Sequence, residues 1–348
     1  MNVRSTLRRA ICASALGLTT LAAPTVHAQT TTLTLSSWAA PTHLLTQKVL
    51  VEWAREVEKA SQGRLRFNLL PKPVASPGNT FDAVRDGLAD ISFILHGAIP
   101  GRFVLTRMVE FPQMGASGEI NSAVYQTLHE KHLAAANEHS GVKVLTVFTH
   151  GPGNILISGK RSVSRPEDLN GIKLRVGGGA VAELMTALGV VPVVRPGSET
   201  HDLIAGGVVD GSLIPYETYV SYRLENHVKN ATRVPDGLYT LSFAVIMNER
   251  AYNALSPQDR QVIDAHSGVR YARLGGRAWD EADKVGLEAM RKNGVNIVDA
   301  SPALVAAIRE KARPIEEAWI AEARKKGVDG AMVLNAFREE TRRMATGR

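Results

Sequence analysis

The sequence lacks several features that would each assign it to a particular class of protein. Among 348 residues there is one cysteine, Cys12, which lies in an N-terminal segment with the features of a removable signal. The rest of the chain therefore has no thiolate for catalysis and no cysteine for zinc, an iron–sulfur cluster or a disulfide. It also has neither an apolar run of the ~20 residues that cross a bilayer nor a dense basic run suited to nucleic acid. We therefore expect a soluble protein that binds no nucleic acid.

The first 28 residues have the three parts of a secretory signal peptide. Arg4, Arg8 and Arg9 form a basic start, residues 10–23 carry no charge and are mainly apolar, and small residues precede a cleavage point after Ala28. The segment has three arginines and no acid, so its removal lowers the formal charge from +7 to +4. The sequence thus predicts export to the periplasm, although the flanks of Arg8 and Arg9 fit a twin-arginine signal poorly.

The composition and the residue patterns predict an α/β protein of about two domains. Apolar residues make up 44% and charged residues 22%, as in globular chains, and ~150 residues per domain gives roughly two domains. Strand and helix patterns alternate, with strands predicted at 31–38, 65–69, 91–95, 142–148, 154–157, 172–176, 190–194, 208–214 and 241–247. From about Ser256 the pattern is helical, with a kink predicted at Pro314. We expect two lobes, each a mostly parallel sheet flanked by helices, joined by a hinge and followed by a helical C-terminal region.

One segment combines an arginine with a glycine-rich turn. Arg175 nearly ends a predicted strand, and Gly177, Gly178 and Gly179 lead from it into a helix. An arginine there lies beside backbone N–H groups and the positive end of a helix dipole, which together favour an anion. Its planar guanidinium suits a carboxylate, since the two groups form paired hydrogen bonds. The alternative is a surface arginine beside a flexible turn.

Residues that follow the predicted strands are further candidates for ligand contact. Ligands of open α/β sheets bind at the carboxyl ends of the strands, and two lobes that face each other close on a ligand between them. The residues in such positions are Trp38 and His96 in the first half of the chain, and Ile214, Tyr216 and Glu217 in the second. The plainer alternative is that they only terminate their strands.

Motifs for other functions are weak. Residues 177–182 fit a GxGxxA dinucleotide pattern, but no acidic residue closes the next strand about 20 positions on. His129 and His132 lie three apart on a predicted helix, without an HExxH pattern or a carboxylate partner for a metal. No GxSxG elbow frames a serine, and no Walker-type phosphate loop is present. We therefore predict no catalytic residue, no cofactor and no metal.

Several segments resemble the solute-binding proteins of TRAP transporters, the DctP family. Residues 168–176, Asp-Leu-Asn-Gly-Ile-Lys-Leu-Arg-Val, resemble the family's DLxGxKxRV segment. The segments that follow it in the family are matched at 189–193 (Gly-Val-Val-Pro-Val) and 207–211 (Gly-Val-Val-Asp-Gly). First-lobe patterns are matched at Trp53, Gly63-Arg64, 87–91 and 100–103. The matches follow the family order over essentially the whole chain after residue 28.

The resemblance implies a fold and a binding site. The fold is that of two-lobe periplasmic binding proteins, with residues 29–151 and about 241–275 in lobe I, and 152–240 and about 276–348 in lobe II. The arginine of the KxRV segment, here Arg175, forms the salt bridge to the ligand carboxylate. A second polar position is occupied here by Asn154, where many members have arginine or glutamine. Two further positions depart from the family: its proline after RV is Gly177, and its asparagine in VDGxxNP is Ile214.

The implied function is capture of a small organic acid and its delivery to a TRAP permease with a small and a large integral subunit. Because Asn154 and Ile214 make the expected pocket less polar, we hypothesise a monocarboxylate with an apolar or aromatic body, ahead of a dicarboxylate or sialic acid. Some members hold their ligand through a cation, for which Glu217 would be the candidate here. The alternatives are an exported α/β enzyme acting on a small carboxylate, a receptor of an ATP-driven transporter and a sensor-input receptor.

Overall fold

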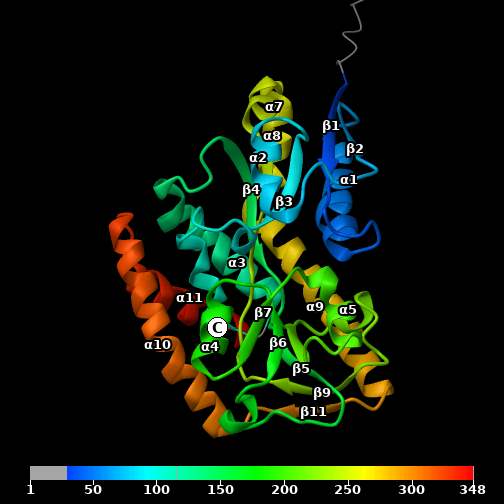
Figure 1. The fold of residues 1–348 in the computed structure, drawn as a ribbon. Coiled ribbons are helices and arrows are strands. Elements are labelled where there is room, and N and C mark those ends of the chain that lie inside the picture. Colours follow the sequence, from blue (N-terminus) through cyan, green and yellow to red (C-terminus); the bar gives the residue numbers. More distant parts are fainter. Residues whose placement is uncertain (1–29, 116, 348) are drawn as a thin grey trace, which may run out of the picture.

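The structure is a computed structural model that describes residues 30–115 and 117–347. The predicted signal peptide, residues 1–28, lies outside the described residues. Two separate β-sheets occupy the upper and lower parts of the molecule in Figure 1, and helices flank both. Within the described residues, no helix is long and apolar enough to cross a membrane.

The first sheet has five strands in the order β2-β1-β3-β10-β4. Their bounds are β1 (Thr31–Ser36), β2 (Leu65–Leu69), β3 (Ile91–Leu95), β4 (Val142–Thr149) and β10 (Ser242–Asn248). Strand β1 pairs in parallel with β2 and β3, whereas β10 is antiparallel to both β3 and β4. Successive residues of β10 point to opposite faces, so Ala244 and Ile246 join one apolar core while Phe243 and Val245 join another.

The second sheet has six strands in the order β11-β9-β5-β8-β6-β7. Their bounds are β5 (Asn154–Ser158), β6 (Lys173–Val176), β7 (Val191–Val194), β8 (Gly211–Ile214), β9 (Val228–Arg233) and β11 (Asn296–Asp299). Strand β6 lies in parallel between β7 and β8, and β5 runs antiparallel to β8 and β9. The two-lobe α/β prediction is confirmed. In each sheet all strands but one run in the same direction, and the exceptions, β10 and β5, make both sheets mixed.

The longest helices cross from one sheet to the other. The helices are α1 (Trp53–Ala60), α2 (Thr80–Arg85), α3 (Gly118–Leu128), α4 (Ala180–Ala187), α5 (Thr200–Ala205), α6 (Thr218–Ser221), α7 (Glu249–Ala254), α8 (Pro257–Ala265), α9 (Gly268–Lys292), α10 (Pro302–Lys325) and α11 (Gly330–Ala345). Helix α9 contributes Trp279 to a core of the first sheet and Met290 to a core of the second. Helix α10 likewise contributes Ile308 to the second and Trp319 to the first, with Pro314 between them. These two helices tie the lobes together.

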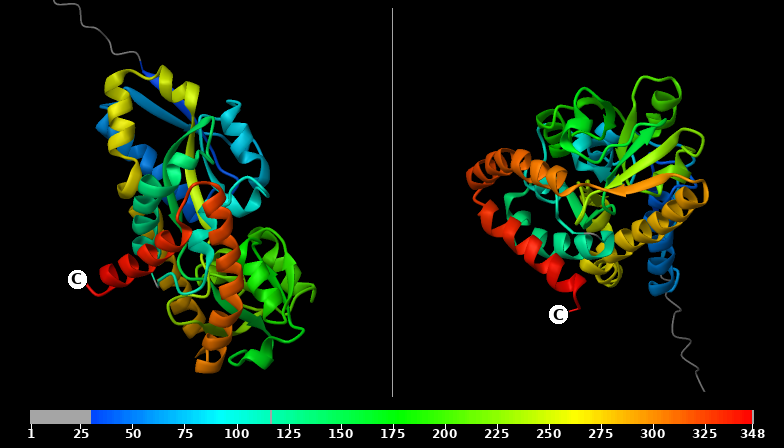
Figure 2. Two further views of the ribbon diagram at one scale, coloured as in Figure 1. Left: turned by 90° about the vertical axis from the view of Figure 1, so that its left-hand side faces the viewer. Right: turned by 90° about the horizontal axis from the view of Figure 1, so that it is seen from below.

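The last helix packs with the first lobe. Val333, Leu334 and Phe337 of α11 share an apolar core with Tyr125 of α3 and Val147 of β4. Figure 2 shows α10 and α11, in orange and red, side by side along one flank of the molecule. The sequence assigned residues up to 348 to the second lobe, and the packing of α11 differs from that assignment. The other lobe boundaries stay a prediction.

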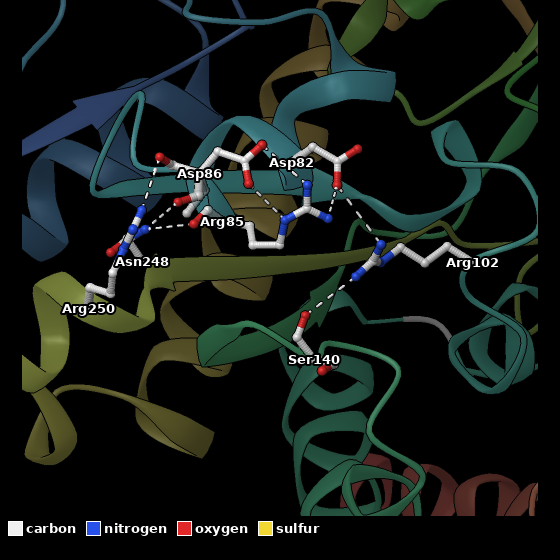
Figure 3. Close-up of polar contacts among 8 residues, drawn as sticks. Asp82, Arg85, Asp86, Arg102, Ser140, Asn248 and Arg250 are labelled. Atoms are coloured by element: carbon white, nitrogen blue, oxygen red, sulfur yellow. Dashed lines mark hydrogen bonds and ion pairs between the residues drawn. The ribbon is translucent and has the colours of Figure 1, made fainter.

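Helix α2 is held to the end of β10 by one asparagine (Figure 3). The Asn248 amide nitrogen donates to the carbonyl oxygens of Val84 and Arg85 at 2.8 and 3.0 Å, which satisfies the last turn of α2. Its Oδ1 accepts from the backbone N–H of Ala251 at 2.9 Å and so caps the start of α7. On the other side of α2, Arg102 lies over the Phe81 ring at 3.7 Å.

Candidate ligand-binding site

Arg175 is a buried cation without a counter-charge among the described residues. It lies on β6, opposite Val193 of β7 and Ser212 of β8, and is 5% exposed. Its Nε donates to the backbone carbonyl of Arg195 at 2.9 Å, and no described Asp or Glu forms an ion pair with it. Burial lowers the pKa of this guanidinium. A charge taken out of water needs a partner, so this arrangement favours an anion from outside the chain.

The glycine-rich turn places Arg175 beside the start of α4. A Cβ atom on Gly177 would lie 3.8 Å from a terminal nitrogen of the Arg175 guanidinium. Gly178 and Gly179 have φ angles of 85° and 71°, a left-handed conformation that side chains rarely adopt. The N–H of Ala180 does not point free to a ligand as the sequence suggested, because it donates to Glu110 Oε2 of the first lobe at 3.3 Å. The anion contacts at this turn therefore centre on the arginine.

Asn154 begins β5 directly beside Ile214, the last residue of β8. It is 2% exposed, and its amide nitrogen donates to the Pro152 carbonyl at 3.0 Å. Ile214 is also buried, and its side chain joins the core that contains Met290 of α9. Leu213 faces the opposite core, as the alternation along a strand requires. The structure thus gives Ile214 a packing role, and a ligand contact by Asn154 stays a prediction.

Tyr216 and Glu217 follow β8 but face different surroundings. Tyr216 lies in the same core as Met290; its hydroxyl has no hydrogen-bond partner among the described residues, and burial raises its pKa to about 12. The Glu217 carboxylate is 5% exposed and lies 3.6 Å from His43 Nε2 of the first lobe, too far for a hydrogen bond. Its backbone N–H donates to Asp283 Oδ1 of α9 at 2.7 Å. Glu217 therefore lies where the two lobes meet, whereas Tyr216 belongs to the core of the second lobe.

Trp38 and His96 have their polar atoms bound within the first lobe. The Trp38 indole N–H donates to the Phe93 carbonyl at 3.1 Å, and the two rings lie 4.6 Å apart. Both ring nitrogens of His96 are engaged, Nδ1 with Ser242 Oγ and Nε2 with His139 Nε2, each at 2.8 Å. Burial lowers the pKa of His96 to about 3, so this imidazole is neutral near pH 7. Neither side chain contacts Arg175 in the described part of the chain.

His150 and Trp279 were not selected from the sequence, although their rings are buried neighbours in the fold. His150 is 2% exposed and Trp279 4%, and their ring centroids are 5.6 Å apart. Burial, together with a smaller effect of the positive charge of Arg175, lowers the pKa of His150 to about 4. Rings of Tyr239 and Phe243 lie 5.4 and 6.3 Å from the His150 ring. The surroundings of Arg175 are thus rich in aromatic rings.

Two further features bear on alternative sites. A cavity of about 600 Å³ lies between α10, α11 and the loops around Gln113 and Asp236, and none of the predicted site residues lines it. In the described ranges 30–115 and 117–347, no group of three or more His, Asp or Glu side chains is arranged to hold a metal. The unpaired guanidinium of Arg175 therefore remains the feature that points most directly to a ligand.

A family model described as "Bacterial extracellular solute-binding protein, family 7", DctP, matches residues 35–322. This match spans both sheets and most of α10. It includes β6 with Arg175, the turn that follows it and the segment of His150.

Three solved structures are similar over nine tenths of the chain. A TRAP periplasmic solute-binding protein from Bordetella bronchiseptica, with bound (R)- and (S)-mandelate, is 39% identical with a TM-score of 0.87 and covers 90% of this chain and 99% of its own. One from Rhodoferax ferrireducens, with copurified benzoate, is 27% identical with a TM-score of 0.83, covering 91% and 99%. A marine metagenome protein specific for aromatic acids, with 3-hydroxybenzoate, is 30% identical with a TM-score of 0.83, covering 90% and 99%.

Proposed function

Because this chain belongs to the bacterial extracellular solute-binding proteins of family 7, the DctP family, we propose that it captures an aromatic monocarboxylate where its two lobes meet. It is a TRAP solute-binding protein for small organic acids and not an enzyme, so the alternative of an exported enzyme is set aside. The identity of the acid and the residues that hold it are the proposal.

The observation that carries the proposal is the buried, unpaired guanidinium of Arg175. Of its donors, Nε binds the Arg195 carbonyl, which leaves the terminal nitrogens for a carboxylate. A carboxylate that accepts from both forms a bidentate pair, and exclusion of water strengthens this interaction. Exchange between solvent and site requires the lobes to separate and close again, the hinge motion expected of two lobes around a ligand.

The surroundings of Arg175 support one carboxylate and an aromatic body. The position that often carries a second charge in the family is the neutral Asn154, whose amide already binds a backbone carbonyl. The His150, Tyr239, Phe243 and Trp279 rings form a connected group, in which aromatic contacts are favourable beyond simple burial. The three similar structures hold mandelate, benzoate and 3-hydroxybenzoate, each an aromatic monocarboxylate.

We further propose that the chain acts in the periplasm and delivers its ligand to the two integral subunits of a TRAP permease. The signal-peptide pattern of residues 1–28 and the extracellular family support the compartment. The solved relatives are described as TRAP solute-binding proteins, which supports the partner. Co-purification of the ligand-loaded protein with its permease subunits tests this step.

The binding assignment is tested by calorimetry on the purified protein with benzoate and mandelate. Arg175→Ala should weaken binding by about 3–5 kcal/mol, at least about a hundredfold in Kd, because the carboxylate would be left buried and unpaired. Arg175→Lys should also weaken it, since the planar fork is lost. Arg270→Ala, which removes an exposed arginine paired with Glu56, is the control and should bind as the wild type does. Unchanged affinity in Arg175→Ala would overturn the assignment.

A further inference from the structure

Two buried nitrogens on neighbouring rings lack hydrogen-bond partners among the described residues. They are Nε2 of His150, in the loop after β4, and Nε1 of Trp279, on α9. The two residues are 2% and 4% exposed. A buried polar atom without a partner costs free energy, so such atoms call for a ligand or a water molecule.

The two nitrogens differ in hydrogen-bonding character. His150 Nδ1 contacts the Gly151 carbonyl, which only accepts, so the proton lies on Nδ1 and Nε2 is left as an acceptor. The indole nitrogen of Trp279 only donates. One acceptor and one donor together match a hydroxyl group, which donates its proton to the first and accepts from the second.

The place of these two nitrogens determines how far the ligand's hydroxyl lies from its carboxylate. The His150 and Trp279 rings are neighbours, with centroids 5.6 Å apart. Thr149, which precedes His150, pairs with Ser242 of β10. The side chain of Leu241, next to Ser242, lies 3.2 Å from the place of a Cβ on Gly177, and that place is 3.8 Å from the Arg175 guanidinium. A ligand that reaches both Arg175 and this pair therefore carries its hydroxyl close to its carboxylate.

We propose that His150 and Trp279 select aromatic acids with a hydroxyl next to the carboxylate, that is, aromatic 2-hydroxy acids. This inference rests on the proposed function, because it needs the carboxylate to be held by Arg175. It assigns a specificity role to two residues that are 129 positions apart in the sequence and meet only in the fold.

Other substituents at the same carbon fit the pair less well. A 2-oxo group accepts from Trp279 but leaves the acceptor of His150 without a donor. A 2-amino group is protonated near pH 7 and would place a positive charge beside Arg175, where like charges repel. An acid without a substituent satisfies neither nitrogen. The expected order of affinity is 2-hydroxy, then 2-oxo or unsubstituted, then 2-amino.

The test compares mandelate, phenylglyoxylate, phenylacetate and phenylglycine by calorimetry on the full mature protein. In the wild type, mandelate should bind at least about tenfold more tightly than phenylacetate, because a site that bonds a hydroxyl penalises its absence. In Trp279→Phe and His150→Phe, which keep a ring but remove the polar atom, this ratio should fall toward one while phenylacetate still binds. Trp53→Phe is the matched control, since the Trp53 indole already donates to the His266 carbonyl, and it should keep the wild-type ratio.

The outcomes separate this inference from the function on which it rests. If none of the four acids binds, carboxylate capture by Arg175 is wrong. If mandelate and phenylacetate bind equally well in the wild type, carboxylate capture stands and the hydroxyl selection is wrong. If the two variants weaken the binding of mandelate and phenylacetate by the same factor, His150 and Trp279 support the fold but do not bind the hydroxyl, and the inference is again overturned.

Discussion

Glu110 Oε2 accepts a hydrogen bond of 3.3 Å from the backbone N–H of Ala180, and this bond joins the first lobe to the first residue of α4. Glu110 is 1% exposed, and its other carboxylate oxygen has no partner among the described residues. A Cβ on Gly179 would lie 2.4 Å from Oε2, so only glycine leaves room for this approach. The turn that follows Arg175 is therefore fixed from across the lobe interface.

The stability that Glu110 contributes depends on pH. Burial raises the pKa of Glu110 to about 7, and the Ala180 amide opposes part of this rise. Between about pH 4.5 and 7 the folded state therefore holds a proton that the unfolded state has lost, and stability falls as pH rises through this window. Glu110→Gln keeps an acceptor for Ala180 but stays neutral. We expect its Tm, relative to the wild type, to be higher at pH 8 than at pH 5.

Thermal unfolding of both proteins at the two pH values measures this difference. Gly179→Ala is a control at the same place that leaves the charge alone, and it should lower Tm at both pH values because of its crowding and left-handed φ. If the difference in Tm between Glu110→Gln and the wild type were the same at pH 5 and pH 8, the Glu110 carboxyl would not titrate in this range.

Three buried histidines of the first lobe should make the protein sensitive to acid. His96 and His139 are joined through their Nε2 atoms at 2.8 Å, and the His129 ring lies 5.5 Å from that of His139. Burial lowers the pKa of His96 to about 3 and of His129 to about 4, and it holds that of His139 well below its usual value. The unfolded state takes up these protons below pH 6.5, so stability falls as pH drops from about 6.5 to 4.

Urea unfolding at pH 6.5, 5.5 and 4.5 measures this loss. Each histidine changes the free energy of unfolding by at most about 1.4 kcal/mol per pH unit. Glu110 changes it in the opposite sense and so cancels up to the contribution of one histidine. His129→Phe keeps a ring but removes one group that takes up a proton on unfolding. The stability of this variant should therefore fall less steeply with acidification than that of the wild type. Parallel curves for the two proteins would contradict a neutral, buried His129.

Much of the fold was predictable because most strands either are mainly apolar or alternate apolar with polar residues. The predicted strand at 241–247, for example, lies within one residue of β10, whose residues are all buried. Strands β9 (Val228–Arg233) and β11 (Asn296–Asp299) were missed, since β9 has only two apolar residues and β11 is only four residues long. The direction of β5 and β10 was also missed, because it depends on the crossing between lobes and leaves no trace in local periodicity.

The candidate site was predictable only where one segment carries the whole signal. Arg175 and its glycine turn are adjacent in sequence, so their combination could be recognised before the fold was known. His150 and Trp279 are 129 positions apart, and α9 alone brings them together by crossing both lobes. Ile214 shows what a strand end alone leaves open: ligand contact stays a prediction there, and the alternation along β8 directs its side chain into the core with Met290.

The double capping role of Asn248 predicts a large loss of stability on its removal. Asn248→Ala would delete the N-cap of α7, worth about 1 kcal/mol, and leave the Val84 and Arg85 carbonyls of α2 without their donor, at about 1–3 kcal/mol. The expected loss is about 2–4 kcal/mol. Asn248→Ser keeps an oxygen that can accept from Ala251 but loses the donor to α2, so it should rank between alanine and the wild type.

Urea unfolding of the three proteins gives this order, and ligand calorimetry provides the control. Asn248 lies on the first lobe at the opposite end of β10 from Ser242, whose neighbour Leu241 approaches Gly177 beside Arg175. Its loss should therefore lower stability while the affinity of the folded protein for benzoate stays unchanged. If Asn248→Ser were as unstable as Asn248→Ala, the α7 cap would contribute nothing, and the stability would come from the α2 carbonyls alone.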